Sequence, residues 1–261
     1  MGCSKDRESV PATLTRESPA SQPAGRILVG TAGWQVPAQH RPAFADSGSH
    51  LARYASRFAA VEINSSFYRP HAAKVYERWA ASVPETFRFS VKCPQLITHE
   101  RQLANARQPL ERFLGEIAGL GNKLGPVLVQ LPPSHEFQFA RVKRFLTLIR
   151  KHHAGPIVCE PRHVTWLSPS ADQLLIDFSI ARVAADPARA AGFERPGGWP
   201  GLVYYRWHGS PRMYWSAYAN VALEEHSRRV KTATVETWTV FDNTAMGTAA
   251  GNALTLVELL G

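Results

Sequence analysis

Short runs of apolar residues recur along the chain, and most of the segments between them have helical periodicity. In residues 51–58, for example, Leu51, Tyr54, Ala55 and Phe58 follow the spacing of one helix face. The apolar runs predict eight strands, near residues 27–29, 61–68, 87–93, 126–131, 156–160, 180–186, 202–208 and 236–242. Helices are predicted near residues 51–58, 72–81, 109–119, 139–152, 170–178, 221–231 and 247–260. This alternation is typical of an α/β fold with a parallel sheet.

Eight strands alternating with about eight helices predict a (β/α)8 TIM barrel, which typically needs ~250 residues. We expect a single domain over residues 26–261, because the composition does not change along that stretch. A doubly wound open sheet is the alternative fold. The first strand is not followed by a G-x-G-x-x-G motif, since Gly30 and Gly33 lead into Trp34 and Gln35, and this disfavours the alternative.

Residues 1–25 differ from the rest of the chain. They are rich in Ser, Pro, Ala and charged residues, lack periodicity and contain no apolar core of a secretory signal, so we predict a disordered tail. Asp6 stands where a myristoylation motif has Ser or Thr. No later run approaches the ~18–20 apolar residues of a membrane span. Cys3, Cys93 and Cys159 form no paired framework, which favours a reducing cytoplasm, with Cys93 and Cys159 as small core residues.

Polar residues in the predicted strands fall mostly on one parity. Glu62 and Asn64 alternate with Val61 and Ile63, so both polar side chains are expected on the same face. In the eighth strand the alternation is less clear, because Thr239 and Asn243 share a parity with Phe241. The other polar residues at the equivalent positions of their strands are Ser90, Lys92, Gln130, Glu160, Arg162, Arg182, Asp186, Tyr204, Arg206 and His208. The positions that alternate with them are mainly apolar: Phe89, Val91, Val129, Leu131, Ile157, Cys159, Val183, Val203 and Tyr205.

Most of these polar residues lie near the C-terminal ends of their strands, where barrel enzymes carry their active sites. A structural role is the alternative, with Glu160–Arg206 or Glu62–Lys92 as buried ion pairs, although so many buried charges are costly to keep for structure alone. The predicted catalytic residues are Glu62, Glu160 and His208. The predicted substrate-binding residues are Asn64, Tyr68, Lys92, Arg162, His163, Trp166, Arg206 and Asn243.

The formal net charge of +9 favours an anionic partner, either a small molecule or a nucleic acid, and no membrane. Charges within the predicted tail cancel, so the excess belongs to the folded part. Arginine forks and a lysine ammonium group are suited to phosphate or carboxylate. A divalent metal is a further candidate cofactor, with ligands drawn from Glu62, His99, Glu160, Asp186 and His208, although no local ligand motif supports it. The basic residues of helix 139–152 are expected to form its solvated face.

Several sequence blocks, in this order, resemble the YecE-like family of bacterial and archaeal proteins, a family of unknown function. They span nearly the whole chain after the tail: residues 30–34 (GTAGW), 61–68 (VEINSSFY), 89–92 with 97–99, 124–133 (LGPVLVQLPP), 160–163 (EPRH) with Trp166, 206–209 (RWHG), and 241–243 with Gly247, Asn252 and Ala253. Two positions depart from the family pattern. Asp242-Asn243-Thr244 replaces the more usual Asn-Asn-Asp, so a role of the family's aspartate does not carry over to Thr244, and Pro161 stands where an aromatic residue is common.

This resemblance implies a TIM barrel without an established activity. The likeness of such barrels to metal-dependent endonuclease and sugar-isomerase barrels implies phosphodiesterase-like chemistry only as an analogy of fold. The residues and the resemblance together predict a hydrolase-like enzyme that binds an anionic, phosphate-bearing substrate at the C-terminal mouth of the barrel, with nucleic acid as one candidate. A nucleic-acid-binding protein without catalysis is the alternative. A carbohydrate hydrolase that uses Glu62 and Glu160 is the third hypothesis.

Overall fold

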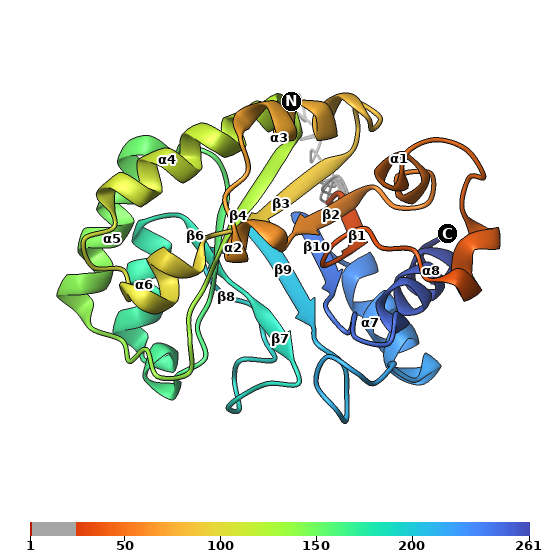
Figure 1. The fold of residues 1–261 in the computed structure, drawn as a ribbon. Helices are drawn as coiled ribbons and strands as arrows, with labels where there is room; N and C mark the ends of the chain where they lie inside the picture. Colours follow the sequence, from red (N-terminus) through yellow and green to blue (C-terminus); the bar gives the residue numbers. More distant parts are fainter. Residues whose placement is uncertain (2–24) are drawn as a thin grey trace.

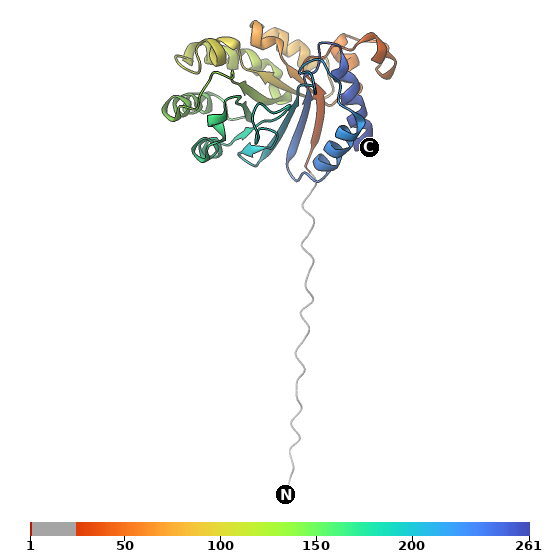
Figure 2. The same cartoon turned by 90° about the horizontal axis from the view of Figure 1, so that it is seen from below.

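The chain folds as alternating strands and helices, with the helices packed around the outside of the strands (Figures 1 and 2). The structure, a computed structural model, describes Met1 and residues 25–261, so Cys3 and nearly all of the predicted tail lie outside the described residues. The strands are β1 (Ile27–Thr31), β2 (Ala60–Ile63), β3 (Arg88–Lys92), β4 (Leu124–Gln130), β5 (Ile157–Glu160), β6 (Ile180–Arg182), β7 (Ala184–Asp186), β8 (Gly197–Gly198), β9 (Leu202–Trp207) and β10 (Glu236–Phe241).

Apart from a short helix at residues 65–68, which was not predicted, the helices lie close to their predicted positions. They are α1 (His50–Tyr54), α2 (Ser65–Tyr68), α3 (Ala73–Ala81), α4 (Arg107–Ile117), α5 (Phe139–His152), α6 (Pro169–Asp177), α7 (Asn220–Lys231) and α8 (Thr248–Leu260). Helix α5 shows why the pattern was informative. Its buried residues Val142, Phe145, Leu146 and Ile149 follow helical spacing, and Lys143 and Arg144 are exposed as expected. The expectation was wrong for Arg150, which is half-buried and donates to the carbonyl oxygens of Phe178 and Gly155. None of the helices in the described part of the chain is long and apolar enough to cross a membrane.

Two sheets contain all the strands. The first is parallel with the order β1-β10-β9-β7, and the second has the order β2-β3-β4-β5-β6-β8, in which only β8 is antiparallel. One isolated bridge, Ala32 to Glu62, connects the end of β1 to β2. The protein is therefore a mixed α/β domain with parallel sheets. The hydrogen-bonded ladders do not form the single closed eight-stranded barrel that we expected.

The strands bury side chains on both faces. A larger apolar cluster fills the layer between strands and helices, and it contains Val61, Ile63, Phe89 and Val91, as the parity argument predicted. Cys93 and Cys159 are buried in the same cluster, which confirms their prediction as core residues. A second, smaller cluster on the opposite face comprises Leu28, Ala60, Leu128, Val158, Ala181, Val183, Leu202, Tyr204, Trp238 and Val240.

Glycine is required where the two sheets approach each other. A Cβ atom added to Gly30 in β1 would lie 2.1 Å from the carbonyl oxygen of Ala60 in β2. Any side chain at this position would push the two strands apart, because heavy atoms do not approach that closely. The glycine therefore brings the C-terminal end of β2 beside that of β1.

Two predictions about the strands were wrong. Strand β2 ends at Ile63, and residues 65–68 form α2, because the Ser66 hydroxyl lies 3.0 Å from the Ile63 carbonyl oxygen and turns the chain. In the sixth strand the faces are exchanged: Val183 belongs to the smaller cluster, whereas Arg182 contacts Asp172 of α6 at 3.5 Å. A polar residue in that strand is thus satisfied on the helix side, and parity misassigned it.

Candidate functional site

Charged side chains gather at the C-terminal ends of four strands. Glu62 is on β2, Glu160 on β5 and Arg206 on β9, while Asp242 follows β10 directly. Parallel pairing brings these strand ends to one side of the sheets. The side chains of Glu62, Glu160 and Arg206 are at most 1% exposed. With His208, Arg162 and Lys92 they form what we call the charge cluster.

Arg206 is the centre of the charge cluster. Its Nε and Nη2 atoms donate to the two carboxylate oxygens of Glu62 at 2.9 and 2.7 Å. Nη1 donates to Glu160 at 2.6 Å, and Nη2 also lies 3.1 Å from Asp242. One guanidinium thus holds three buried carboxylates through all of its nitrogen atoms. Such bidentate, charge-assisted bonds offset part of the cost of removing the charges from water.

His208 connects two of these carboxylates. Its Nδ1 lies 3.0 Å from Asp242 and its Nε2 lies 3.2 Å from Glu160. Burial alone would lower the pKa of His208, but the charge of Glu160 and the hydrogen bonds to both carboxylates outweigh it and raise the pKa. Only the imidazolium form can donate to both acceptors at once. The histidine therefore adds a positive charge to the cluster.

Glu160 is held as a carboxylate. Burial would raise its pKa, yet the positive charges of Arg206, Arg162 and His208 keep the pKa well below its ordinary value. Arg162 donates to it from Nε at 3.0 Å and from Nη2 at 2.9 Å. The same guanidinium lies 3.4 Å from the Tyr214 hydroxyl, on the loop that follows β9.

Tyr204 marks the boundary between the charge cluster and the smaller apolar cluster. Its hydroxyl lies 2.9 Å from Glu62 and 2.9 Å from Ser90, while its ring stacks on Trp238 with 5.8 Å between centroids. The aromatic ring is therefore part of the apolar interior, and its polar end satisfies a buried carboxylate.

Lys92, at the end of β3, has a different environment from the other cations. Among the described residues, no carboxylate or hydrogen-bond acceptor contacts its Nζ, which lies 4.1 Å from the centroid of the Phe67 ring. The residue is 6% exposed. Burial, and next the positive charge of Arg206, lower the pKa of Lys92 to about 8, although Glu62, Asp242 and Glu160 partly oppose this. The predicted Glu62–Lys92 pair is wrong, because Glu62 pairs with Arg206 instead.

The cluster carries more positive than negative charge. Lys92, Arg162 and Arg206 balance Glu62, Glu160 and Asp242, so protonated His208 leaves an excess of one positive charge when Lys92 is also protonated. A pocket of about 10 Å³ next to it, with room for about one water molecule, is lined by Glu160, Arg162 and His208, and by Arg189 and Met213 from the loops after β7 and β9. An excess of buried positive charge beside a pocket attracts an anion.

The remaining predicted residues lie in varied surroundings. Tyr68 is 74% exposed on α2, and the Asn64 amide oxygen is buried without a donor among the described residues. His163 Nδ1 lies 3.0 Å from the Thr165 hydroxyl at the start of a 3-10 turn. Trp166 is buried against Phe137 and His135, and its indole N–H donates to the His135 carbonyl oxygen at 3.0 Å.

At the end of the eighth predicted strand, Asn243 was the predicted substrate-binding residue, but its neighbour Asp242 is the one that reaches the charge cluster. Asn243 is fully buried, and its amide donates to Ser216 and to Asn252 at 2.9 Å, so it fixes the loop after β9 to α8. Asp242 is the residue that joins the charge cluster, and our sequence reasoning missed it. The alternation of Trp238, Val240 and Asp242 against Thr239 and Phe241 was the signal that could have identified it.

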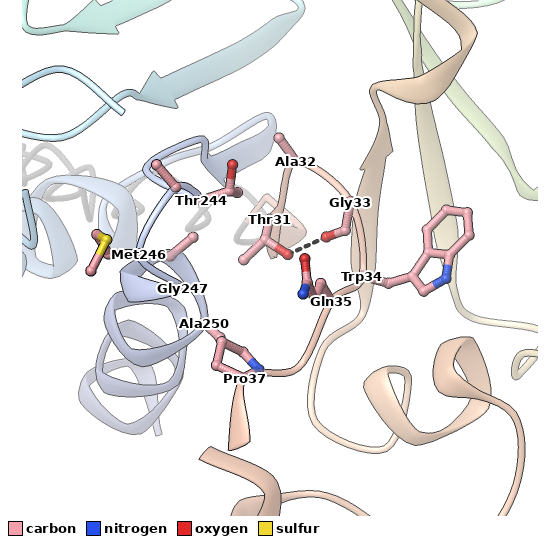
Figure 3. Close-up of a pocket in the computed structure, with 12 residues that line it drawn as sticks. Thr31, Ala32, Gly33, Trp34, Gln35, Pro37, Thr244, Met246, Gly247 and Ala250 are labelled. Atoms are coloured by element: carbon pink, nitrogen blue, oxygen red, sulfur yellow. Dashed lines mark hydrogen bonds between the residues drawn. The ribbon is translucent and has the colours of Figure 1, made fainter. Parts of the chain in front are cut away.

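A second pocket, of about 500 Å³, lies beside the charge cluster at the ends of β1 and β10 (Figure 3). The loop from Thr31 to Pro37 forms one wall and the segment from Thr244 to Ala250 forms the other. None of its lining residues is ionisable. Within the described part of the chain, no group of three or more His, Cys, Asp or Glu side chains is arranged to hold a metal ion. Of the carboxylates considered as ligands, Glu62 and Glu160 are bonded to Arg206, and Asp186 accepts a hydrogen bond from the Tyr218 hydroxyl at 2.8 Å.

Comparison with known proteins gives the family. The model of the family described as "Protein of unknown function DUF72" matches residues 28–261. The chain belongs to this family. It is 27% identical to the UPF0759 protein YunF of Bacillus subtilis, over 90% of this chain and 94% of YunF. It is also 29% identical to the UPF0759 protein YecE of Escherichia coli, over 41% of this chain and 38% of YecE. The resemblance found in the sequence blocks is thereby confirmed.

Solved structures of the DUF72 family share the fold. A family member from Enterococcus faecalis superposes with a TM-score of 0.75 at 24% identity, over 90% of this chain and 95% of that one. Another from Thermotoga maritima gives a TM-score of 0.71 at 23% identity, over 90% and 99% of the two chains. At this identity the likeness concerns the fold, so the chemistry must be argued from the site.

Proposed function

We propose that this DUF72 protein is an enzyme that binds a small substrate with a phosphate or carboxylate group at the C-terminal ends of its strands. The observation that carries the proposal is the charge cluster, which has an excess of positive charge beside a pocket lined by Arg162 and His208. Burying so many charges is costly, and replacing buried ion pairs with apolar residues is often stabilising. A structural role alone therefore explains the cluster poorly.

The strand order supports a TIM-barrel architecture for this site. Read from β7 through β9, β10 and β1, the order continues across the Ala32–Glu62 bridge to β2 and on to β6. Only Val183 separates β6 from β7 in the chain. In such a barrel the charge cluster occupies the end at which TIM-barrel enzymes bind their substrates.

Two cations have bonding capacity left for a substrate. Arg162 gives one edge to Glu160, and its other contacts, to Tyr214, are long at 3.4 Å. Lys92 has no acceptor among the described residues. Arg206, in contrast, already bonds carboxylates through every nitrogen atom. We therefore assign anion binding to Arg162, substrate contact to Lys92, and positioning of the carboxylates to Arg206.

His208 is the proton carrier in this proposal. Its raised pKa favours the protonated ring, which lines the pocket beside Arg162. Proton transfer exchanges the 3.2 Å hydrogen bond from Nε2 to Glu160 for one to the substrate. Glu160, with its depressed pKa, is unsuited to act as a general acid. This disfavours the carbohydrate-hydrolase hypothesis, in which one of the two glutamates must donate a proton. Hydrolysis of an anionic ester, with His208 protonating the leaving oxygen, remains the reaction we propose.

A second candidate is binding of nucleic acid without catalysis. Exposed aromatic residues support it: Tyr68 is on α2 after β2, and Trp215, on the loop after β9, packs against Arg212 with 4.3 Å from guanidinium to ring centroid. Such rings stack on bases, and phosphate contacts make the affinity fall with salt. Binding of single-stranded DNA that does not change between low and high salt would contradict this version.

The anion site is tested by calorimetric titration with inorganic phosphate at constant ionic strength. We expect Arg162→Met to weaken binding about ten- to a hundredfold, because a hydrogen bond to a charged group contributes ~1.5–3 kcal/mol. Arg150→Met is the matched control. Arg150 is also half-buried, but it donates to the carbonyl oxygens of Phe178 and Gly155 at the opposite ends of the strands. Equal phosphate affinity in wild type and Arg162→Met would overturn the proposal.

A further inference from the structure

Lys92 and Lys123 are both buried lysines, and their partners differ. Lys123 donates to the carbonyl oxygens of Ala80 and Val83 at 2.8 Å and lies 3.5 Å from Glu85. Its ammonium group is therefore satisfied in a way that suits a permanently charged residue. Lys92 has an aromatic ring on one side and no acceptor among the described residues. A buried ammonium group without a partner is costly.

We propose that Lys92 is a nucleophilic amine that forms an imine with a carbonyl substrate carrying an anionic group. The inference rests on the anion site of the proposed function, because it assigns the anionic group to Arg162. It adds a reaction at Lys92 that is separate from the ester hydrolysis assigned to His208. Lysines act in this way when they are desolvated or lie beside another cation.

The surroundings of Lys92 provide both desolvation of the amine and a nearby cation, Arg206. Phe67 covers one side of the Lys92 amine at 4.1 Å, and the Ser66 hydroxyl, 2.7 Å from the Lys92 carbonyl oxygen, ties α2 to the end of β3. The nearby carboxylates do not serve as counter-ions, because Arg206 holds Glu62, Glu160 and Asp242. Their charges only partly offset the effects of burial and of Arg206 on the Lys92 pKa, and none of the three carboxylates contacts the amine.

Lys92 and Arg162 both influence His99. His99 packs edge-on against Phe67 with 4.9 Å between ring centroids. Burial lowers the pKa of His99, and the positive charges of Lys92 and Arg162 lower it further. The amine and the guanidinium are thus both near enough to His99 for their charges to act on it, as a substrate with a carbonyl group and an anionic group requires.

The pKa of Lys92, lowered to about 8, agrees with this role. An amine with this pKa holds roughly 300-fold more of the neutral, nucleophilic form near pH 7 than an ordinary lysine with a pKa near 10.4. Burial and then Arg206 lower this pKa, whereas Glu62, Asp242 and Glu160 raise it.

The proposed step needs no oxidant or reductant. The neutral Lys92 nitrogen bonds to the carbonyl carbon as the C=O π bond opens, and one proton passes from that nitrogen to the carbonyl oxygen to give a carbinolamine. The carbon–oxygen bond then breaks, the oxygen leaves as water after a second protonation, and the nitrogen loses its remaining proton as the C=N bond forms. His208 carries the proton required for the departure of water.

Reductive trapping tests the inference directly. The full-length protein is incubated with glycolaldehyde phosphate and sodium cyanoborohydride, and the modified residues are located by peptide mass spectrometry. We expect Lys92 to be alkylated at least about tenfold faster than the exposed lysines Lys74, Lys143 and Lys231, because more of its amine is neutral. The α-amino terminus is an internal reference for an amine outside the proposed anion site.

Two controls separate reactivity from access. Inorganic phosphate should protect Lys92 but not the α-amino terminus, and neutral glycolaldehyde should label Lys92 more slowly than its phosphate ester. Lys92→Arg should abolish the adduct while retaining the charge, and Lys123→Arg should leave labelling of Lys92 unchanged. A circular dichroism spectrum of each variant shows whether it has folded.

The outcomes distinguish the two proposals. If phosphate binds in the calorimetric titration but Lys92 is labelled no faster than the exposed lysines, the imine inference is overturned and the anion site stands. If Lys92 is labelled equally by the neutral aldehyde and phosphate neither binds nor protects, the anion site is overturned. Rapid, phosphate-sensitive labelling of Lys92 supports both.

Discussion

The smaller apolar cluster and the charge cluster are built by the same strands, and only two residues of chain separate one from the other. On five of the strands an inward residue that packs against apolar neighbours is followed, two positions later, by a polar residue. The pairs are Ala60 and Glu62, Leu128 and Gln130, Val158 and Glu160, Tyr204 and Arg206, and Val240 and Asp242. Because the strands are parallel, all the second members meet at one end.

The two regions differ in what holds them together. Apolar burial contributes roughly 25 cal/mol per Å² whatever the exact partners, so the apolar cluster tolerates many combinations of side chains. The charge cluster depends on exact pairing, because a carboxylate that loses its cation is left buried and uncompensated. Stability therefore comes mainly from the apolar cluster and chemistry from the charge cluster. The three predictions that follow test this division.

Arg206→Met should have the largest effect on stability. The substitution leaves Glu62, Glu160 and Asp242 without their shared cation, and we expect a loss of about 3–5 kcal/mol in the free energy of unfolding, measured by urea denaturation. An unchanged unfolding free energy would show that the carboxylates have other partners and that the cluster is not organised by Arg206.

Leu128→Ala should be costly for stability alone. Leu128 is fully buried in the smaller apolar cluster, and the cavity left behind should reduce the free energy of unfolding by about 2–5 kcal/mol. Phosphate affinity of the folded variant should match that of wild type. A variant that keeps its stability but loses phosphate binding would reverse the proposed division between the two regions.

The smallest effect should be seen in the pH dependence of stability at two buried histidines. The raised pKa of His208 contributes stability that is present below pH 6.5 and is lost as the pH rises through the folded-state pKa. His226 lies among Tyr205 and Trp207, and burial, followed by the charge of Arg229, lowers its pKa to about 3. Its contribution is present above pH 6.5 and decreases by about 2 kcal/mol as the pH falls from 8 to 5.

Replacing each histidine by Gln should remove its own contribution to the pH dependence of the free energy of unfolding. Urea unfolding of His208→Gln should lose the decline on the alkaline side, and that of His226→Gln should lose the decline on the acid side. Glu160 and Asp242 also contribute to the decrease in the free energy of unfolding at low pH. Arg206 lowers the pKa of both carboxyls against the effect of burial, so their contribution is lost only as the pH falls from about 4.5 downward. Slopes of the same sign for both histidines would contradict the assigned environments.

The distribution of elements could be predicted from the sequence because it depends on local patterns. Apolar runs and helical spacing located the main strands and helices, and parity correctly placed Glu62, Lys92, Glu160 and Arg206 opposite Val61, Val91 and Cys159. The same reasoning failed where the local pattern was weak. It exchanged the faces at Arg182, extended β2 through the Ser66 turn and selected Asn243 over Asp242.

By itself the sequence determined where polar side chains alternate with apolar ones, and hence that one face of several strands would carry charge. Only the tertiary structure decided which charges pair. Arg206 meets Glu62, Glu160 and Asp242 across separations of 144, 46 and 36 residues. Those contacts depend on strand register and on the reach of each side chain, which no local pattern contains. As a result, among the described residues no carboxylate contacts Lys92, because Glu62, Glu160 and Asp242 are bonded to Arg206.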